Sequence, residues 1–163
     1  MLLERRARLA VPRGALSALA AAAWLLLAGC TVRMIADYDE HTFNRTAEIH
    51  EQCEALFVGL EDAAVTPDPT DDLYPAHAQE YFELVAALRA LQARAETLDK
   101  NEITAEQVSL LRDSIETMQS QHRERSASAE PKGFSLEALR VLHEPVAQQF
   151  RSILTLQTAL KRD

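Results

Sequence analysis

Apolar side chains recur every three or four residues over most of this chain, in four separate stretches. Residues three and four apart lie on one face of a helix, so each stretch predicts an amphipathic α-helix. Glycine occurs only four times and no long alternating runs of β-branched residues are present, which disfavours strands. The connections between stretches are a few to a dozen residues long. We therefore predict an all-α fold, an antiparallel up-and-down four-helix bundle. The stretches cover residues 36–60, Asp72 to about Leu98, Thr104 to about His122, and Ser135 to Arg162.

Residue types near the ends of these stretches predict where the helices begin. Asp72 and Ser135 have side chains that cap helix N-termini, and Thr104 with Gln107 has the form of a capping box. Pro145 falls inside the last stretch, where proline removes a backbone hydrogen bond and clashes with the preceding turn. We therefore expect the last helix to be kinked or broken near Pro145.

The first 29 residues have the order of a secretory signal peptide. Arg5, Arg6, Arg8 and Arg13 precede an apolar run over residues 15–27, and small residues follow. The sequence Leu27-Ala28-Gly29-Cys30 resembles the lipobox of bacterial lipoproteins, whose cysteine is acylated on sulfur and becomes the acylated N-terminus after cleavage. An uncleaved transmembrane anchor is the alternative, but residues 15–28 fall short of the roughly 20 apolar residues that span a bilayer.

Lipidation of Cys30 implies a location and a domain organisation. In lipoproteins of Gram-negative bacteria an aspartate after the cysteine is the usual signal for retention in the inner membrane, and Thr31 stands there instead. The resemblance therefore implies an outer-membrane protein that faces the periplasm. Residues 1–29 would be removed, residues 30–35 would form a lipidated tether, and residues 36–163 would form one bundle domain.

The charge of the mature chain excludes one class of partner. Cleavage removes four arginines and Glu4 from 17 basic and 25 acidic side chains, which leaves 13 and 24 and a formal charge of −11. Because nucleic-acid binding requires clustered Lys and Arg, we expect no nucleic-acid partner. Cys53 is the one cysteine left besides the lipidated Cys30, so the mature domain cannot form an intramolecular disulfide. Its fold must be stabilised by side-chain packing.

Several segments of the mature chain are similar to a group of small, uncharacterised bacterial lipoproteins. The resemblance implies a helical fold and an envelope location, and it supplies no activity and no catalytic residues. The segments are Ile35 to Glu40, Phe57 to Glu61, Arg94 to Thr104 with Leu110 and Leu111, and Ile153 to Lys161.

Histidines are the first candidates for a metal or haem site inside the bundle. His122 and His143 lie on separate predicted helices, and Met118 lies near the first of them in sequence. No Glu stands three residues before any histidine, and neither Cys-x-x-Cys-His nor His-Glu-x-x-His occurs. The alternative is that these are half-buried structural histidines.

Two further features have structural explanations that compete with functional ones. Cys53 falls on the apolar stripe of the first helix, where a buried thiol is inert. The acidic side chains of Asp37-Tyr38-Asp39-Glu40 would cap the first helix and interact favourably with the positive end of its dipole. The functional alternative is that they coordinate calcium near the membrane. The acidic segment from Asp68 to Asp72 lacks the central Gly and terminal Glu of a calcium loop.

Tyr74, Tyr81 and Phe82 gather at the start of the second helix. They either pack in the core or form an exposed surface that anchors a partner. With no catalytic constellation in the sequence, we expect a non-enzymatic, membrane-tethered interaction or structural module of the cell envelope. The alternative is a carrier that holds a small ligand, a metal or haem in the bundle interior.

Overall fold

The computed structural model describes residues 36–65, 73–128 and 132–162. Four helices make up this part of the chain: α2 (Glu40–Val65), α3 (Tyr74–Thr97), α4 (Glu102–Ser128) and α5 (Leu136–Leu160). No strand occurs in the three described ranges, so the all-α prediction is confirmed. The signal peptide, Cys30 and the tether predicted before residue 36 lie outside the described residues.

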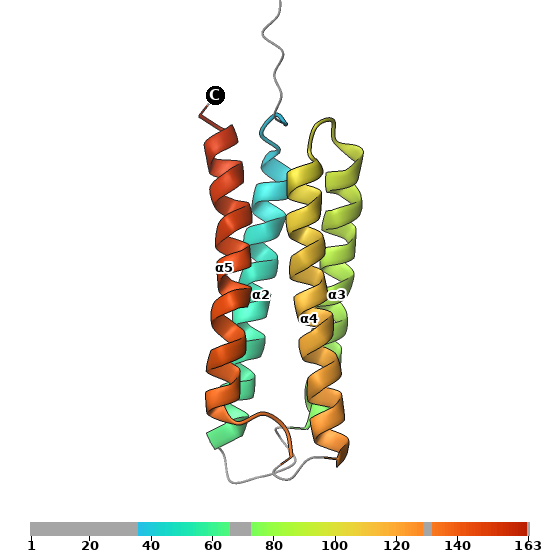
Figure 1. The fold of residues 1–163 in the computed structure, drawn as a ribbon, viewed down its shortest axis with the longest axis vertical. Coiled ribbons are helices and arrows are strands. Elements are labelled where there is room, and N and C mark those ends of the chain that lie inside the picture. Colours follow the sequence, from blue (N-terminus) through green and yellow to red (C-terminus); the bar gives the residue numbers. More distant parts are fainter. Residues whose placement is uncertain (1–35, 66–72, 129–131, 163) are drawn as a thin grey trace, which may run out of the picture. The chain divides into compact units, whose positions relative to one another are not determined.

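The helices form a four-helix bundle in which each helix packs against two neighbours. α2 contacts α3 and α5, and α4 contacts the same two helices, whereas α2 does not contact α4 and α3 does not contact α5. Consecutive helices run in opposite directions (Figure 1), which confirms the up-and-down topology. The predicted stripes meet along the bundle axis and form one core, whose largest fully buried side chains are Tyr81, Phe57, Phe150, Ile49, Leu60, Leu84, Leu88, Leu111, Ile115, Met118, Leu139 and Ile153.

Side-chain caps start two of the helices. Ser135 caps α5 as predicted, whereas α2 begins at Glu40, after Asp39, and not at the predicted residue 36. Asp39 precedes α2 and its Oδ2 accepts a hydrogen bond from the amide of Thr42 at 3.1 Å. Ser135 precedes α5 and accepts from the amide of Ala138 at 3.2 Å. Both oxygens satisfy amides that have no partner within the helix, which is the purpose of an N-cap.

The predicted starts of α3 and α4 are wrong. Leu73 is the N-cap residue of α3 and provides no side-chain cap, while Asp72 lies outside the described residues. The amide of Tyr74 instead donates to the hydroxyl of Ser126 on α4 at 2.8 Å, so a neighbouring helix supplies the acceptor. Thr104 lies inside α4, which begins two residues earlier, at Glu102.

A tight turn decides where α4 begins. Lys100 adopts a left-handed backbone with φ of 59°, and the buried Asn101 after it donates to the carbonyl of Ala95 at 3.2 Å. The carbonyl of Asn101 then accepts from the amide of Ala105, which closes the first turn of the helix. This leaves the Thr104 hydroxyl buried, where it accepts from Nε2 of Gln157 on α5 at 3.2 Å.

The far ends of the helices also differ from the expectation. α2 extends to Val65 rather than residue 60, and α4 extends to Ser128 rather than ending near His122. α5 runs as one helix through Pro145 (Figure 1), so of the two expected outcomes, a kink or a break, the break is wrong. Pro145 is exposed, and the buried side chains on either side of it keep the apolar face of α5 against the core.

Candidate functional site

Two adjoining hollows form a groove along the outer side of α4 and α5. One hollow, of about 650 Å³, lies near the start of α5, and the other, of about 370 Å³, lies near the middle of both helices. Val141 and Leu142 line both hollows, so the two hollows adjoin. We call this surface the α4–α5 groove, and its lining includes Leu110, Ser114, Thr117, Met118, Gln121, Glu124, Arg125, Phe134, Glu137, Ala138, Val141, Leu142, Pro145 and Gln149.

Large apolar side chains stand exposed in this groove. Val141 is 69% exposed and Leu110 is 55% exposed, although each lies next to a residue of its helix's core stripe. Neither was singled out as a site residue in the sequence. Val141 lies between Arg140 and Glu144 on the polar face of α5, and an apolar residue out of phase with the stripe is the signal that could have identified it.

Val141 and Pro145 both line one of the hollows. A proline has no N–H, so the carbonyl of Val141 does not receive the hydrogen bond that residue 145 of a regular helix would donate. Gln149 donates to the hydroxyl of Ser114 across the two helices at 3.0 Å, while its own Oε1 is buried without a hydrogen-bond donor.

Carboxylates outnumber cations among the groove residues. Asp113, Glu124 and Glu137 line it, whereas Arg125 is its one basic lining residue in the described ranges. The Arg125 guanidinium is already engaged, since Nε donates to the carbonyl of Gly133 at 2.7 Å and the group lies 6.0 Å from the centre of the Phe134 ring. Asp113 is paired with Arg112, whose Nη2 lies 2.7 Å from its Oδ1, so the groove is an apolar channel bordered by charges of both signs.

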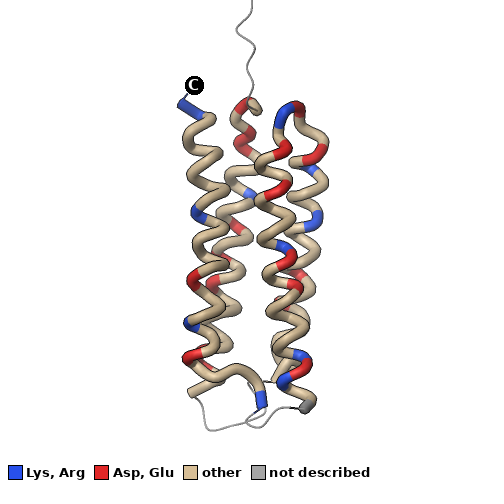
Figure 2. The backbone as a smooth tube through the Cα atoms, in the orientation of Figure 1, with Lys and Arg blue, Asp and Glu red and all other residues tan. Residues whose placement is uncertain are grey.

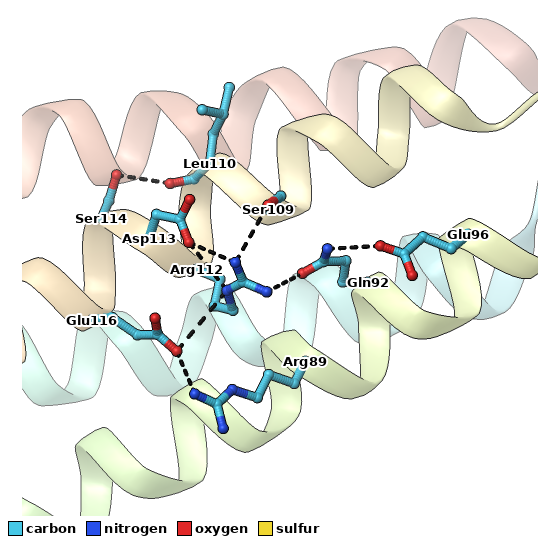
Figure 3. Close-up of polar contacts among 9 residues, drawn as sticks. All are labelled: Arg89, Gln92, Glu96, Ser109, Leu110, Arg112, Asp113, Ser114 and Glu116. Carbon is cyan, nitrogen blue, oxygen red and sulfur yellow. Dashed lines mark hydrogen bonds and ion pairs between the residues drawn. The ribbon is translucent and has the colours of Figure 1, made fainter.

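A polar network that includes Asp113 joins α4 to α3 (Figure 3). Arg112 donates to Oε1 of Gln92 at 2.6 Å and to Oδ1 of Asp113 at 2.7 Å. Arg89 of α3 donates to Glu116 of α4 at 2.7 Å. Figure 2 shows that acidic and basic residues occur on all four helices, so what distinguishes the groove is its exposed apolar lining.

His122 is a core residue in an aromatic cluster between α3, α4 and the segment before α5. Its side chain is fully buried, and Nδ1 lies 3.3 Å from the hydroxyl of Tyr81. The rings of Tyr74, His77 and Phe134 lie within 6.0 Å of the His122 ring, centre to centre. Aromatic packing and a satisfied imidazole explain this histidine without a ligand.

The proposed partner surface of Tyr74, Tyr81 and Phe82 is not one surface. Tyr81 is 0% exposed and belongs to the core, so its assignment to a partner surface is wrong. Tyr74 is half-buried, and its hydroxyl accepts from Gln119 at 3.0 Å and Arg123 at 2.8 Å. Only Phe82, at 66% exposed, projects from this group.

His143 belongs to a second cluster, between α2 and α5. Its Nε2 lies 2.9 and 3.0 Å from the two carboxylate oxygens of Glu54, and Nε2 of His50 lies 3.2 Å from Oε1 of the same group. The His143 ring packs on Phe57 and the His50 ring stacks on Phe150. His122 and His143 thus lie in separate clusters, and the structure does not bring the two predicted metal candidates together.

The described residues contain no group of three or more His, Cys, Asp or Glu side chains arranged to hold a metal ion. Met118, the third residue considered as a candidate ligand, is buried in the core. No helix among the residues searched is long and apolar enough to cross a membrane.

The thiol of Cys53 lies in the core, where the sequence placed it. It is 1% exposed, and burial, followed by the negative charge of neighbouring Glu54, raises its pKa to about 12. A thiol must ionise to act as a nucleophile, so this environment suppresses reactivity.

Comparison with protein-family models, with curated proteins and with solved structures finds no match to this chain. The resemblance to uncharacterised lipoproteins, seen in short segments of the sequence, therefore stays a prediction.

Proposed function

We propose that this protein is a lipid-anchored component of the cell envelope, held in the outer membrane by acylated Cys30, and that its helical bundle is a non-enzymatic interaction module facing the periplasm. The anchor is supported by the order of arginines, apolar run and Leu27-Ala28-Gly29-Cys30 at the start of the chain. Two or more acyl chains hold a protein stably at a membrane, whereas one chain holds it only marginally.

The observation that carries the interaction role is the α4–α5 groove with Val141 69% exposed in it. Single exposed apolar residues are ordinary on a protein surface, but a hollow lined by several of them is typical of a binding site for a protein or ligand. A bound partner would cover Val141 and Leu110 and remove their apolar surface from water.

Affinity purification of the lipidated protein from crosslinked envelopes tests this proposal. Cys30→Ser, which cannot be acylated, is the control for location, and mass spectrometry of the N-terminal peptide measures acylation directly. We expect an acylated Cys30, recovery in the outer-membrane fraction, and a protein partner that is recovered with the lipidated form alone. An unmodified Cys30 would overturn the anchor, and the absence of any crosslinked protein would overturn the interaction module.

A second candidate function is a carrier of a small ligand, a metal or haem. The observation in its favour is that His50, Glu54 and His143 meet between α2 and α5, with side chains 28%, 40% and 32% exposed, although these three are not arranged to hold a metal ion by themselves. Binding to the native state raises the melting temperature by mass action. We expect such a rise with zinc, copper, iron or haem if the carrier role holds, and its loss in His143→Ala; no shift with any of them would exclude it.

A further inference from the structure

We propose that the bundle contacts the lipid headgroup surface with one end, formed by residues 37–41, 97–104 and 157–162, and that Ile103 reaches the lipid there. We call this surface the near end. The inference rests on the acylation of Cys30 proposed above, and it names the part of the bundle that meets the membrane.

Printed contacts bring the three segments of the near end together. Asp39, just before α2, pairs with Arg94 in the last turn of α3 at 2.8 Å. Nζ of Lys161, just after α5, lies 5.2 Å from the centre of the Tyr38 ring. Figure 1 shows the start of α2, the turn between α3 and α4, and the end of α5 at the same end of the bundle. The chain that enters α2 is therefore held to both neighbouring helices at this end.

The length of chain between the anchor and the bundle limits which surface can meet the membrane. Cys30 and Ala36, the first described residue, are six residues apart. A fully extended chain spans at most about 3.5 Å per residue, so this segment reaches at most about 21 Å. The four helices have 24 to 27 residues, which at 1.5 Å per residue is about 36–40 Å. The near end therefore stays close to the membrane, whereas the opposite end reaches it only if the bundle lies on its side.

Charge disfavours one way of lying on the side. Residues 53–85 include eight Asp and Glu residues and no Lys or Arg. The described part of this range forms the second half of α2 and the first half of α3, which are neighbours in the bundle. Headgroup phosphates repel such a surface.

The near end carries charges of both signs. Such a surface suits a zwitterionic headgroup, which offers a phosphate to lysine and arginine and an ammonium group to carboxylates. The charged residues of the near end include Asp37, Glu40, Asp99, Lys100, Glu102, Lys161 and Arg162.

Ile103 is the apolar residue of the near end that can enter lipid. It is 57% exposed and is the second residue of α4, directly after the turn. Val58, Phe82 and Val141 are similarly exposed, but they lie 15 to 19 residues from the near ends of their helices, or about 22–28 Å. Apolar side chains at a membrane surface insert at the boundary of headgroups and acyl chains, while lysines keep their ammonium groups in the headgroup layer.

Site-specific fluorescence on vesicles tests the proposal. The acylated protein is purified from the cells that make it, reconstituted in phosphatidylcholine vesicles, and labelled with a thiol-reactive fluorophore at Ile103→Cys. Acylation blocks the sulfur of Cys30, and Cys53 is 1% exposed, so the label enters the new cysteine. We expect phosphatidylcholine with brominated acyl chains to quench the label at position 103.

Control positions of similar exposure report on the sides of the bundle. The same label at Val58→Cys, Phe82→Cys or Val141→Cys should keep its fluorescence in brominated vesicles. Asp99, whose side chain is 91% exposed in the turn, gives a second position at the near end. A label at Asp99→Cys should be quenched by a spin label carried on the lipid headgroup.

The outcomes separate this inference from the anchor on which it rests. Quenching at Val58, Phe82 or Val141 as strong as at Ile103 would show that the bundle lies on its side, and would overturn the end-on contact. Absence of quenching at every position, in protein that floats with the vesicles and has an acylated N-terminal peptide by mass spectrometry, would overturn the contact while the anchor stands. An unmodified Cys30 would overturn both.

A charged substitution tests the role of Ile103 itself. Ile103→Asp should reduce the quenching of the label at Asp99→Cys, because a carboxylate does not enter the acyl region. Val141→Asp makes the same change at an exposed position far from the near end, and it should leave that quenching unchanged. Equal effects of the two substitutions would overturn Ile103 as the residue that contacts lipid.

Discussion

Arg94 donates two hydrogen bonds to the carboxylate of Asp39, from Nε to Oδ2 at 2.8 Å and from Nη2 to Oδ1 at 2.9 Å. This pair joins the last turn of α3 to the start of α2. The Asp39 side chain is 19% exposed, and it also accepts from the amide and hydroxyl of Thr42. The hydrogen bonds from Arg94, helped by those from Thr42, hold the pKa of Asp39 well below its usual range. One residue therefore acts as a helix cap and as an interhelical ion pair.

The stability of the bundle should depend on pH through Asp39. The pKa of this carboxyl is lower in the folded chain than in the unfolded chain, so below about pH 4 the unfolded state binds more protons. The Asp39 carboxylate therefore contributes to the free energy of unfolding above about pH 4, and this contribution is lost as the pH falls through the pKa that Asp39 has in the folded state. We expect Asp39→Asn to lower the free energy of unfolding by about 1–2 kcal/mol at neutral pH and by less in acid.

Urea unfolding across a pH series measures this difference. Asp99→Asn is the control, because the Asp99 side chain is 91% exposed in the turn between α3 and α4. A difference between Asp39→Asn and the natural protein that stays constant down to strong acid would contradict the assignment.

Cys53 should resist alkylation while the protein is folded. Its thiol is buried and its pKa is raised to about 12, so almost no thiolate forms near neutral pH. We expect iodoacetamide to modify Cys53 only after unfolding by concentrated guanidinium, as measured by mass spectrometry of the peptide. Native labelling at the rate of the unfolded chain would show that the first helix opens locally.

The buried pair of Thr104 and Gln157 should be replaceable as a unit but not singly. Nε2 of Gln157 donates to the Thr104 hydroxyl at 3.2 Å, and Oε1 of Gln157 is buried without a donor. Thr104→Val alone removes the acceptor and should cost about 1–2 kcal/mol, whereas adding Gln157→Leu removes both polar partners and should restore or exceed the original stability. A double variant less stable than Thr104→Val would contradict this reasoning.

Pro145→Ala should stabilise α5. The substitution restores a backbone donor for the carbonyl of Val141, and proline costs about 3 kcal/mol relative to alanine in a helix interior. Since Pro145 is exposed and α5 already continues through it, we expect a gain of about 1–3 kcal/mol in the free energy of unfolding. A loss of stability would indicate that packing around the proline ring matters more than the missing hydrogen bond.

The number, class and order of the helices could be predicted from the sequence because helical periodicity is local. Ile49, Leu88, Ile115 and Phe150 recur with their neighbours every three or four residues, and all four are buried. The same local chemistry identified Ser135 as an N-cap, since a cap is a contact with an amide three residues away. The residues that predict a signal peptide and a lipobox are likewise contiguous, and this prediction remains the basis for the proposed location.

Contacts between helices were decided by the tertiary structure alone. Ser126 supplies the acceptor for the first amide of α3, and Thr104 lies buried against Gln157 instead of starting a helix. Tyr81 meets His122 across 41 positions of sequence, which removes it from the surface where it could have bound a partner. Such pairs depend on how each helix is rotated and how far it is shifted along its neighbour, and no local spacing contains that information.

The groove combines both kinds of information. Val141 and Leu110 break the stripe pattern in the sequence, but whether such residues form a surface depends on which helices become neighbours. The sequence by itself determined that four amphipathic helices form, because the burial of one helix face depends on the spacing of neighbouring residues. Tertiary packing decided which polar groups are satisfied and which apolar side chains stay exposed, because those outcomes depend on the partner that each helix face meets.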